Sequence, residues 1–273
     1  MLQLIQIVGL PFLVCLMMSF VLGYLGIHVL KREVVFVDIA LAQVAAVGTI
    51  VSHLAFDAHE NSVLSYACSL AAVFGMAAFY AVARTSIVQI SLEAIIGISY
   101  AIAAAAALFL VGMKPGGHLH IQHILSGSLL WTDGRDVLLG VLTFSLVGLC
   151  LYLVRKPLMS LSGSYRHTPP KGARAIFWDF IFYFLLGIVI TLSVQMGGVV
   201  LVFAYLIIPA TISAVFASQL GIQLIIIWIT AIAASISGLL FAYYLDFSIG
   251  PAIALLLGVE LIIAAIIGKL IRV

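Results

Sequence analysis

The sequence predicts an all-α, polytopic membrane protein with about nine transmembrane helices. Its 273 residues are 65% hydrophobic and only 8% charged, whereas soluble globular domains are typically about 25% charged. The mean hydropathy is +1.32. Apolar runs long enough to cross a bilayer, about 20 residues each, recur along the chain and leave no stretch for a soluble domain. We therefore expect residues 1–273 to form a single transmembrane domain.

Nine apolar runs are the candidate spans. They cover residues 4–27, 35–55, 62–83, 92–113, 137–154, 176–195, 197–217, 222–245 and 249–268. The first run has neither a basic segment before it nor a clear cleavage site, so we expect a retained span rather than a signal peptide.

The connections between these runs are short, with two exceptions. The longest polar one, residues 155–174, contains Ser-Gly-Ser and Pro-Pro and is expected to be a loop. Residues 124–131 are too short to cross the membrane, which predicts a short interfacial or re-entrant segment near 120–131.

The positive charges predict the orientation, because Lys and Arg are enriched in cytoplasmic loops. With the N-terminus outside and the C-terminus cytoplasmic, only Lys114 and Arg135 of the 12 Lys and Arg residues lie on the outer face. The cytoplasmic set is Lys31, Arg32, Arg84, Arg155, Lys156, Arg166, Lys171, Arg174, Lys269 and Arg272. These charges are scattered and the net charge is only +2, so nothing indicates a nucleic-acid partner.

Asp38 and Gln43 stand in the second apolar run, directly after the basic turn at Lys31 and Arg32. A carboxylate at the centre of a membrane helix costs about 2.5–3.5 kcal/mol on insertion scales, so it is a functional-site candidate by default. The alternative is that Asp38 lies near the membrane surface, hydrated or paired with Lys31 or Arg32. Five positions on a helix separate two side chains by about 140°, so Asp38 and Gln43 line one cavity only if the helix is irregular or the cavity wraps around it.

His118, His120 and His123 form an HxHxxH pattern on the predicted outer face. Imidazole is a common ligand of zinc and other transition metals, and the three rings could converge on one ion. The alternative is a solvated loop, because such a pattern alone is weakly specific.

Glu260 is the other deeply placed acid, in the ninth run. It is either an intramembrane ligand or proton-linked group, or it pairs with a polar group of a neighbouring helix. Glu93 and Asp179 begin the fourth and sixth runs, where the helix dipole favours carboxylates, so a structural role is expected for both.

The sequence contains no nucleotide-binding P-loop, no HExxH and no GxSxG motif. We therefore expect a transport protein that is not itself an enzyme. Uphill transport would draw its energy from an ion gradient or from another subunit.

Four stretches, in order along the chain, carry a resemblance to a known family. They are residues 26–48, residues 92–111 followed by HILSGSLL, residues 196–217 with a Pro-Ala pair, and residues 241–255 with Asp and Gly-Pro. In these stretches the chain resembles the integral membrane permeases of ABC importers for zinc, manganese and iron.

This resemblance implies a multi-pass protein of the bacterial inner membrane that carries a divalent transition metal and has no tightly bound cofactor. It implies a second copy of the chain, two copies of a cytoplasmic ATP-binding subunit and an extracytoplasmic metal-binding protein. It also implies that the ATPase contacts the segment after the Pro-Ala pair, with Ala214, Ser218, Gln219 and Gln223 as candidate coupling residues.

The family's ligand pair is an Asp followed four residues later by a His, and this chain departs from it. Gln43 stands at the His position, five residues after Asp38, and an amide oxygen is a poor substitute for imidazole at zinc. Either Asp38 acts with groups from elsewhere, such as the three histidines or Glu260, or the cargo differs. The alternative functions are a permease for a metal chelate, siderophore or cobalamin-like solute, and a gradient-driven carrier without an ATPase.

Overall fold

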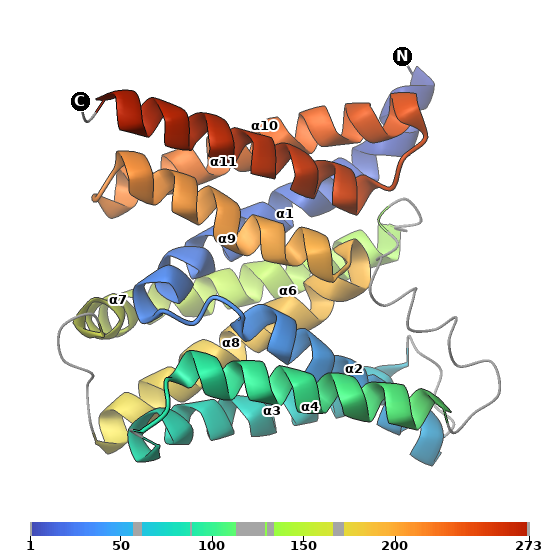
Figure 1. Cartoon of the computed structure of the whole chain (residues 1–273). Helices are drawn as coiled ribbons and strands as arrows, with labels where there is room; N and C mark the ends of the chain where they lie inside the picture. The colour runs from blue at the N-terminus through green and yellow to red at the C-terminus, as the bar shows by residue number, and fades with distance from the viewer. Residues whose placement is uncertain are drawn as a thin grey trace. The chain divides into compact units, whose positions relative to one another are not determined.

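The computed structural model describes residues 2–56, 62–87, 89–112, 129, 134–165 and 172–271, and these ranges contain helices and no β-strand (Figure 1). The helices are α1 (Leu2–Arg32), α2 (Val37–Phe56), α3 (Val63–Ser86), α4 (Leu92–Gly112), α6 (Gly134–Leu153), α7 (Arg155–Ser164), α8 (Ala173–Gly197), α9 (Val199–Phe216), α10 (Leu220–Leu245) and α11 (Ile249–Ile271). The all-α prediction is confirmed.

The span count also agrees with the sequence. Within the described ranges, 8 helices are long and apolar enough to cross a membrane, and the count rises to 9 if the bent pair α6 and α7 forms one span. The two members of that pair, Val137–Leu153 and Arg155–Ser164, are bent by 70°. Each of the nine predicted runs falls on one long helix.

The loop predicted at residues 155–174 is wrong in its first half, where the chain forms α7. Leu158 and Ser162 of this helix are buried, while Arg155 and Lys156 are exposed. The polar residues that suggested a loop instead form the exposed side of a short amphipathic helix. Of the interfacial or re-entrant segment predicted near 120–131, only Leu129 lies among the described residues.

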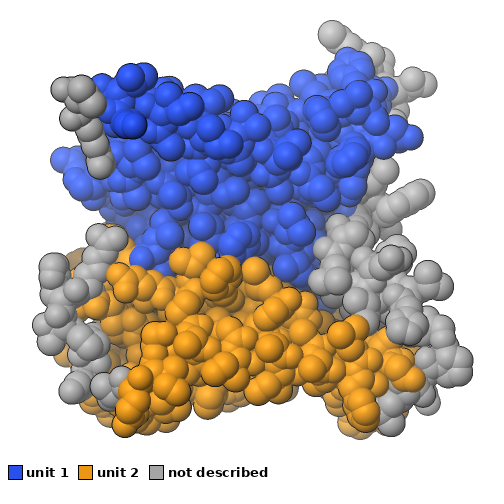
Figure 2. All heavy atoms as spheres, in the orientation of Figure 1, with its two compact units in different colours: residues 1–30, 125–149, 193–273 blue, residues 31–124, 150–192 orange. Residues whose placement is uncertain are grey.

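The helices gather into two compact units, coloured separately in Figure 2. Unit 1 consists of residues 1–30, 125–149 and 193–273, and unit 2 of residues 31–124 and 150–192. Each unit therefore combines segments that are distant in the sequence. That residues 1–273 act as a single permease domain stays a prediction.

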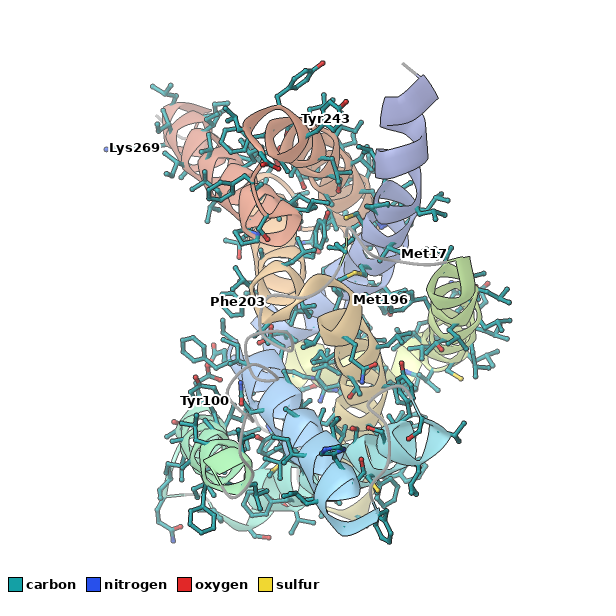
Figure 3. The ribbon with its side chains drawn as sticks, turned by 90° about the vertical axis from the view of Figure 1, so that its right-hand side faces the viewer. Met17, Tyr100, Met196, Phe203, Tyr243 and Lys269 are labelled. Carbon is teal, nitrogen blue, oxygen red and sulfur yellow. The ribbon has the colours of Figure 1, made fainter. Side chains whose placement is uncertain are left out.

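In unit 1, α9, α10 and α11 pack against one another. The helix α1 approaches α9 at Gly26, where a Cβ atom would lie 1.9 Å from the carbonyl oxygen of Leu206. Small residues permit such close contacts in a lipid setting, where apolar burial gives no preference for protein over lipid. The ends of Met17 and Met196 lie against Gly140 of α6, at 3.4 and 3.3 Å from the position of a Cβ there (Figure 3).

The connection between the sixth and seventh runs is a single residue, Gly198, with φ of +79°. This left-handed backbone conformation is open to glycine at no steric cost. It lets α9 begin directly after α8 ends at Gly197.

In unit 2, α2 packs against both α3 and α4. Gly48 of α2 allows the closest approach to α3, since a Cβ there would lie 2.7 Å from the carbonyl oxygen of Cys68. The hydroxyls of Thr49 and Ser69 form a hydrogen bond of 2.7 Å beside it. Tyr80 of α3 and Ser99 of α4 join by a further buried hydrogen bond. The helix α2 is thus the central element to which α3 and α4 attach.

The Gly26 contact generates a stability prediction. Gly26→Ala places a methyl group against the backbone of α9, which cannot move aside as a side chain can, and overpacking of this kind costs about 1–3 kcal/mol. We expect a lower thermal unfolding midpoint in detergent. Gly9→Ala is the matched control in the same helix, because nothing lies within 4 Å of its added Cβ. Equal midpoints for the two variants would contradict the close packing of α1 and α9.

Candidate functional site

Asp38 lies in the first turn of α2 and is only 2% exposed. Its carboxylate lies against the backbone N–H groups of Asp38 and Ile39, where the positive end of the helix dipole stabilises a negative charge. Its Oδ1 atom is buried and has no hydrogen-bond partner among the described residues. Asp38 therefore lies at the end of a spanning helix, with one oxygen uncompensated.

A tight turn delivers the chain from α1 to Asp38. Arg32 ends α1, Glu33 adopts the left-handed conformation with φ of +56°, and the N–H of Val37 donates to the carbonyl of Val34 at 3.3 Å. A positive φ is uncommon for a residue other than glycine. Such a turn persists only where its surroundings hold both sides of it in place.

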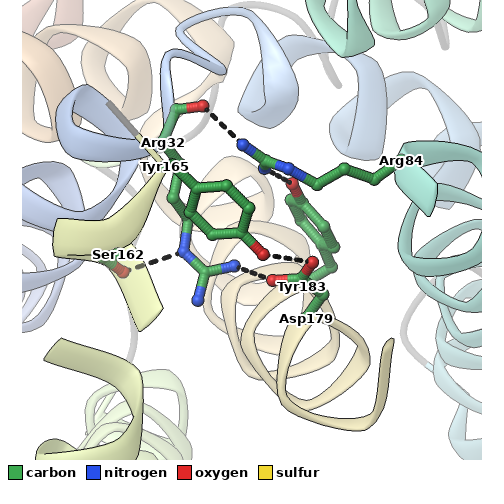
Figure 4. Close-up of polar contacts among 6 residues, drawn as sticks. All are labelled: Arg32, Arg84, Ser162, Tyr165, Asp179 and Tyr183. Carbon is green, nitrogen blue, oxygen red and sulfur yellow. Dashed lines mark hydrogen bonds and ion pairs between the residues drawn. The ribbon is translucent and has the colours of Figure 1, made fainter. Parts of the chain in front are cut away.

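The α1 side of this turn is held by a buried ion pair between Arg32 and Asp179 of α8 (Figure 4). The guanidinium donates to Asp179 Oδ1 at 2.5 Å and through Nε to Ser162 Oγ of α7 at 2.9 Å. Its carbon Cζ lies 4.0 Å from the centroid of the Phe182 ring. Arg32 is therefore not the partner of Asp38, and of the sequence alternative for Asp38 only the pairing with Arg32 is wrong.

Arg84 of α3 completes this network. Its Cζ lies 3.4 Å from the centroid of the Tyr165 ring, and it donates to Tyr183 Oη and to the Arg32 carbonyl, both at 3.1 Å. Tyr165 donates to Asp179 Oδ2 at 2.5 Å. Burial, together with the Asp179 carboxylate, raises the pKa of Tyr165 well above its ordinary value, so its hydroxyl keeps the proton that it donates.

The network joins the ends of α1 and α3, the beginning of α8 and the short helix α7. The charge pattern of the sequence places all four of these ends on the cytoplasmic side. Their meeting in one cluster agrees with this predicted orientation, because segments on the same side of the membrane can contact one another. The structural role expected for Asp179 is confirmed, since both of its oxygens accept hydrogen bonds.

Glu93, in the first turn of α4, holds the other side of the turn. Its Oε1 accepts a hydrogen bond from the N–H of Phe36 at 3.1 Å, and its carboxylate is close enough to Asp38 for the two charges to repel. Its Oε2 is buried and, in the described part of the chain, lacks a partner. Sequence reasoning assigned Glu93 only a structural role. One feature of the sequence could have linked the two acids: Glu93 and Asp38 both stand at the beginning of a span on the predicted cytoplasmic side of the membrane.

Gln43 does not join this pair of acids. It is partly exposed, one and a half turns along α2, and α2 is one continuous helix from Val37 to Phe56. A regular helix separates Asp38 and Gln43 by about 140°. The irregularity that would let both face one cavity is absent from α2.

Glu260 belongs to unit 1, on the half-buried face of α11. Its Oε2 is buried and has no partner within the described ranges. It lies within electrostatic range of Tyr205 of α9, whose hydroxyl shares a 2.5 Å hydrogen bond with Ser235 of α10. Glu260 thus stands beside a polar contact at the centre of the three-helix packing of unit 1.

His118, His120 and His123 lie outside the described residues, so their role stays a prediction. In the ranges that the structure covers, no group of three or more His, Cys, Asp or Glu side chains could hold a metal ion. The candidate site that remains is the pair of acids at the beginning of α2 and α4.

The predicted coupling segment forms the short connection between α9 and α10. Ser218 and Gln219 lie in this connection and Ala214 lies in the last turn of α9, and all three are exposed. Gln223 is 7% exposed and donates from Nε2 to the carbonyl of Ala217 at 2.9 Å. It therefore braces the connection from the first turn of α10, leaving the other three residues available on its surface.

Comparison with known proteins connects these features to a family. A family model described as the ABC 3 transport family matches residues 5–268. The chain is similar to a probable metal transport system membrane protein of Chlamydia pneumoniae, with 25% identity over 167 residues, which are 61% of this chain and 57% of that protein. It is also similar to the manganese transport system membrane protein MntB of Synechocystis, with 25% identity over 210 residues, covering 75% of this chain and 68% of MntB.

The match to the Chlamydia pneumoniae protein thus extends over little more than half of that relative's length. Among solved structures, PsaBC from Streptococcus pneumoniae in complex with Fab superposes with a TM-score of 0.73 and 19% identity, covering 94% of this chain and 90% of that one. This similarity shows a shared fold.

The Arg32–Asp179 network generates the second prediction. Asp179→Asn leaves a buried guanidinium without its counter-charge, and breaking one side of a buried ion pair typically costs about 3–5 kcal/mol. We expect a strong loss of folded protein and a lower unfolding midpoint. Replacing both partners, as Arg32→Met with Asp179→Leu, should restore much of the loss, because no charge is left unpaired. A double variant less stable than Asp179→Asn would contradict this account.

Proposed function

The chain belongs to the ABC 3 transport family, and on this premise we propose that it is the membrane permease subunit of an ATP-driven importer for a divalent transition metal ion. The ion would pass from an extracytoplasmic binding protein to the cytoplasm by alternating access. The single observation that carries the proposal is Asp38, a carboxylate 2% exposed at the beginning of a spanning helix, with one oxygen uncompensated.

The chemistry at Asp38 suits a transported ion. A permeation site must attract the ion and still release it, which favours a few oxygen ligands over a closed cage of four strong ones. Carboxylate oxygens suit manganese better than zinc among the candidate metals, since zinc prefers imidazole and thiolate. We therefore place manganese first, with iron and zinc as the other cargoes to be tested.

The energy would come from partner subunits, because the sequence contains no P-loop. The exposed residues Ala214, Ser218 and Gln219 offer a contact surface for a cytoplasmic ATPase, with Gln223 holding the connection in shape. We infer two ATPase subunits, a second copy of this chain and residence in the bacterial inner membrane.

Asp38→Asn tests the ligand assignment. The amide keeps the size and one oxygen of the side chain but removes its charge, so we expect metal uptake by cells to fall to background while the permease still assembles with its ATPase. Asp246→Asn is the control, since Asp246 is exposed and caps α10 in a left-handed conformation that Asn also tolerates. Normal uptake with Asp38→Asn would refute the role of Asp38.

The same uptake assay separates the alternative functions. Competition between free and chelated ions distinguishes an ion permease from a chelate permease. Uptake by proteoliposomes that contain this chain without an ATPase would instead establish a gradient-driven carrier. We expect the free ion to be the preferred cargo and uptake to require the ATPase and ATP.

Ser218→Trp tests the coupling surface. A bulky ring on the exposed connection between α9 and α10 should obstruct the ATPase, so we expect less ATPase to co-purify and uptake to fall. Ser248→Trp is the matched control, because Ser248 is an exposed serine in the connection at the opposite end of α10. Equal recovery of ATPase with both variants would place the contact elsewhere.

A further inference from the structure

We propose that Glu93 binds the transported divalent cation together with Asp38, forming a two-carboxylate site at the predicted cytoplasmic end of unit 2. This inference rests on the proposed transport function and adds a second ligand that the family's ligand pattern in the sequence did not indicate. The carrying observation is that two neighbouring acids, on different helices, each bury an oxygen that no described residue satisfies.

The first step is the proximity of the two side chains. Glu93 Oε1 accepts from the N–H of Phe36 at 3.1 Å, and Phe36 precedes Asp38 by only two residues. The helices α2 and α4, which carry the two acids in their first turns, pack directly against each other. The two carboxylates also interact electrostatically. This proximity supports a shared site for one ion.

The second step is the balance of charge. Two like charges at short range repel, and burial removes the water that would otherwise screen them. Two cations of the adjoining network are already committed: Arg32 pairs with Asp179, and Arg84 lies on the Tyr165 ring and donates to Tyr183. A divalent cation would neutralise both acids at once.

The third step separates binding from simple capping. A carboxylate that only caps the turn needs one acceptor oxygen, and Glu93 uses Oε1 for that purpose. Its second oxygen, Oε2, is buried without a partner, as is Oδ1 of Asp38. Leaving a buried charged group without a hydrogen-bond partner is costly. The hydrogen bond to the turn does not satisfy these two oxygens, and a bound cation would.

The site's exposure suits release of the ion. Asp38 is almost completely buried, whereas Glu93 is half-buried as a residue although its Oε2 is buried, so the site lies at the edge of the buried region. Two carboxylates supply fewer oxygens than the six or more that hard divalent ions take, so water would complete the coordination. Such a site binds weakly enough to pass the ion onward.

The test is Mn²⁺ binding by the intact complex of permease and ATPase in lipid nanodiscs, measured by equilibrium dialysis, with ATP-driven uptake measured in parallel. Glu93→Gln removes the charge but keeps the oxygen that accepts from Phe36. We expect Glu93→Gln and Asp38→Asn each to weaken Mn²⁺ binding at least about tenfold, as loss of a supporting group at a metal site typically does. Because both groups contact one ion, the double variant should lose less than the product of the two single effects.

Two further variants isolate the structural contribution. Glu33→Gln makes the same charge change on an exposed residue of the same turn and should leave Mn²⁺ binding unchanged. Glu93→Ala also removes the hydrogen bond to Phe36 and should lower the unfolding midpoint more than Glu93→Gln does. If Glu93→Gln binds and transports Mn²⁺ as the unmodified chain does, Glu93 is only a cap and the inference fails.

The outcome also separates this inference from the proposed function. Loss of uptake with Asp38→Asn, combined with normal binding and uptake with Glu93→Gln, overturns the two-carboxylate site and leaves the transporter intact. Absence of divalent-metal binding and uptake in the unmodified complex overturns both. Strictly multiplicative effects of the two substitutions would show that the acids do not share an ion.

Discussion

The buried ion pair between Arg32 and Asp179 is the interaction on which the geometry of unit 2 depends. A guanidinium that is 1% exposed is tolerated only because a carboxylate, a hydroxyl and an aromatic face surround it. These partners come from α7 and α8, while Arg84 of α3 donates to the Arg32 carbonyl. The last residue of α1 is thereby held, and with it the left-handed turn that places Asp38 at the beginning of α2.

The same network explains why three acids on the predicted cytoplasmic side, Asp38, Glu93 and Asp179, differ in their hydrogen-bond partners. Asp179 accepts hydrogen bonds at both oxygens from Arg32 and Tyr165, so its charge is used within the fold. Asp38 and Glu93 each retain a buried oxygen without a described partner. Arg32 is engaged by Asp179, and Arg84 by Tyr165 and Tyr183, so neither of these two cations is left for Asp38 or Glu93. Counting partners thus distinguishes a structural carboxylate from candidate ligands that residue type alone would treat alike.

Membership in the ABC 3 transport family gives this arrangement its context. An importer must hold its cargo for a short time, and a site of few oxygens achieves this more readily than a complete coordination shell. In the proposed importer, the replacement of the expected imidazole by Gln43, which does not share a face with Asp38 on the continuous helix α2, would leave oxygen atoms as the ligands of the ion. Glu260 lies in unit 1 beside Tyr205 and stands as a separate intramembrane acid.

The sequence by itself determined the features that depend on local composition. Hydropathy defined nine apolar runs, and each falls on a long helix, because a bilayer requires about 20 apolar residues whatever their partners. Hydropathy missed α7, where a polar composition concealed a short helix that contacts Arg32 through Ser162 and Lys31 through Met159. The role predicted for the three histidines of the HxHxxH pattern stays a prediction, since those residues lie outside the described ranges.

Only the tertiary structure decided which acid has which partner. Arg32 and Asp179 are separated by 147 positions, and Phe36 and Glu93 by 57, so no local pattern could join them. Sequence reasoning singled out Asp38 from the cost of a charge in an apolar run, offered Arg32 as a possible partner and gave Glu93 a structural role. Helix packing gave Arg32 to Asp179 and Glu93 to the N–H of Phe36, because burial and partner choice are properties of side chains brought together from distant segments.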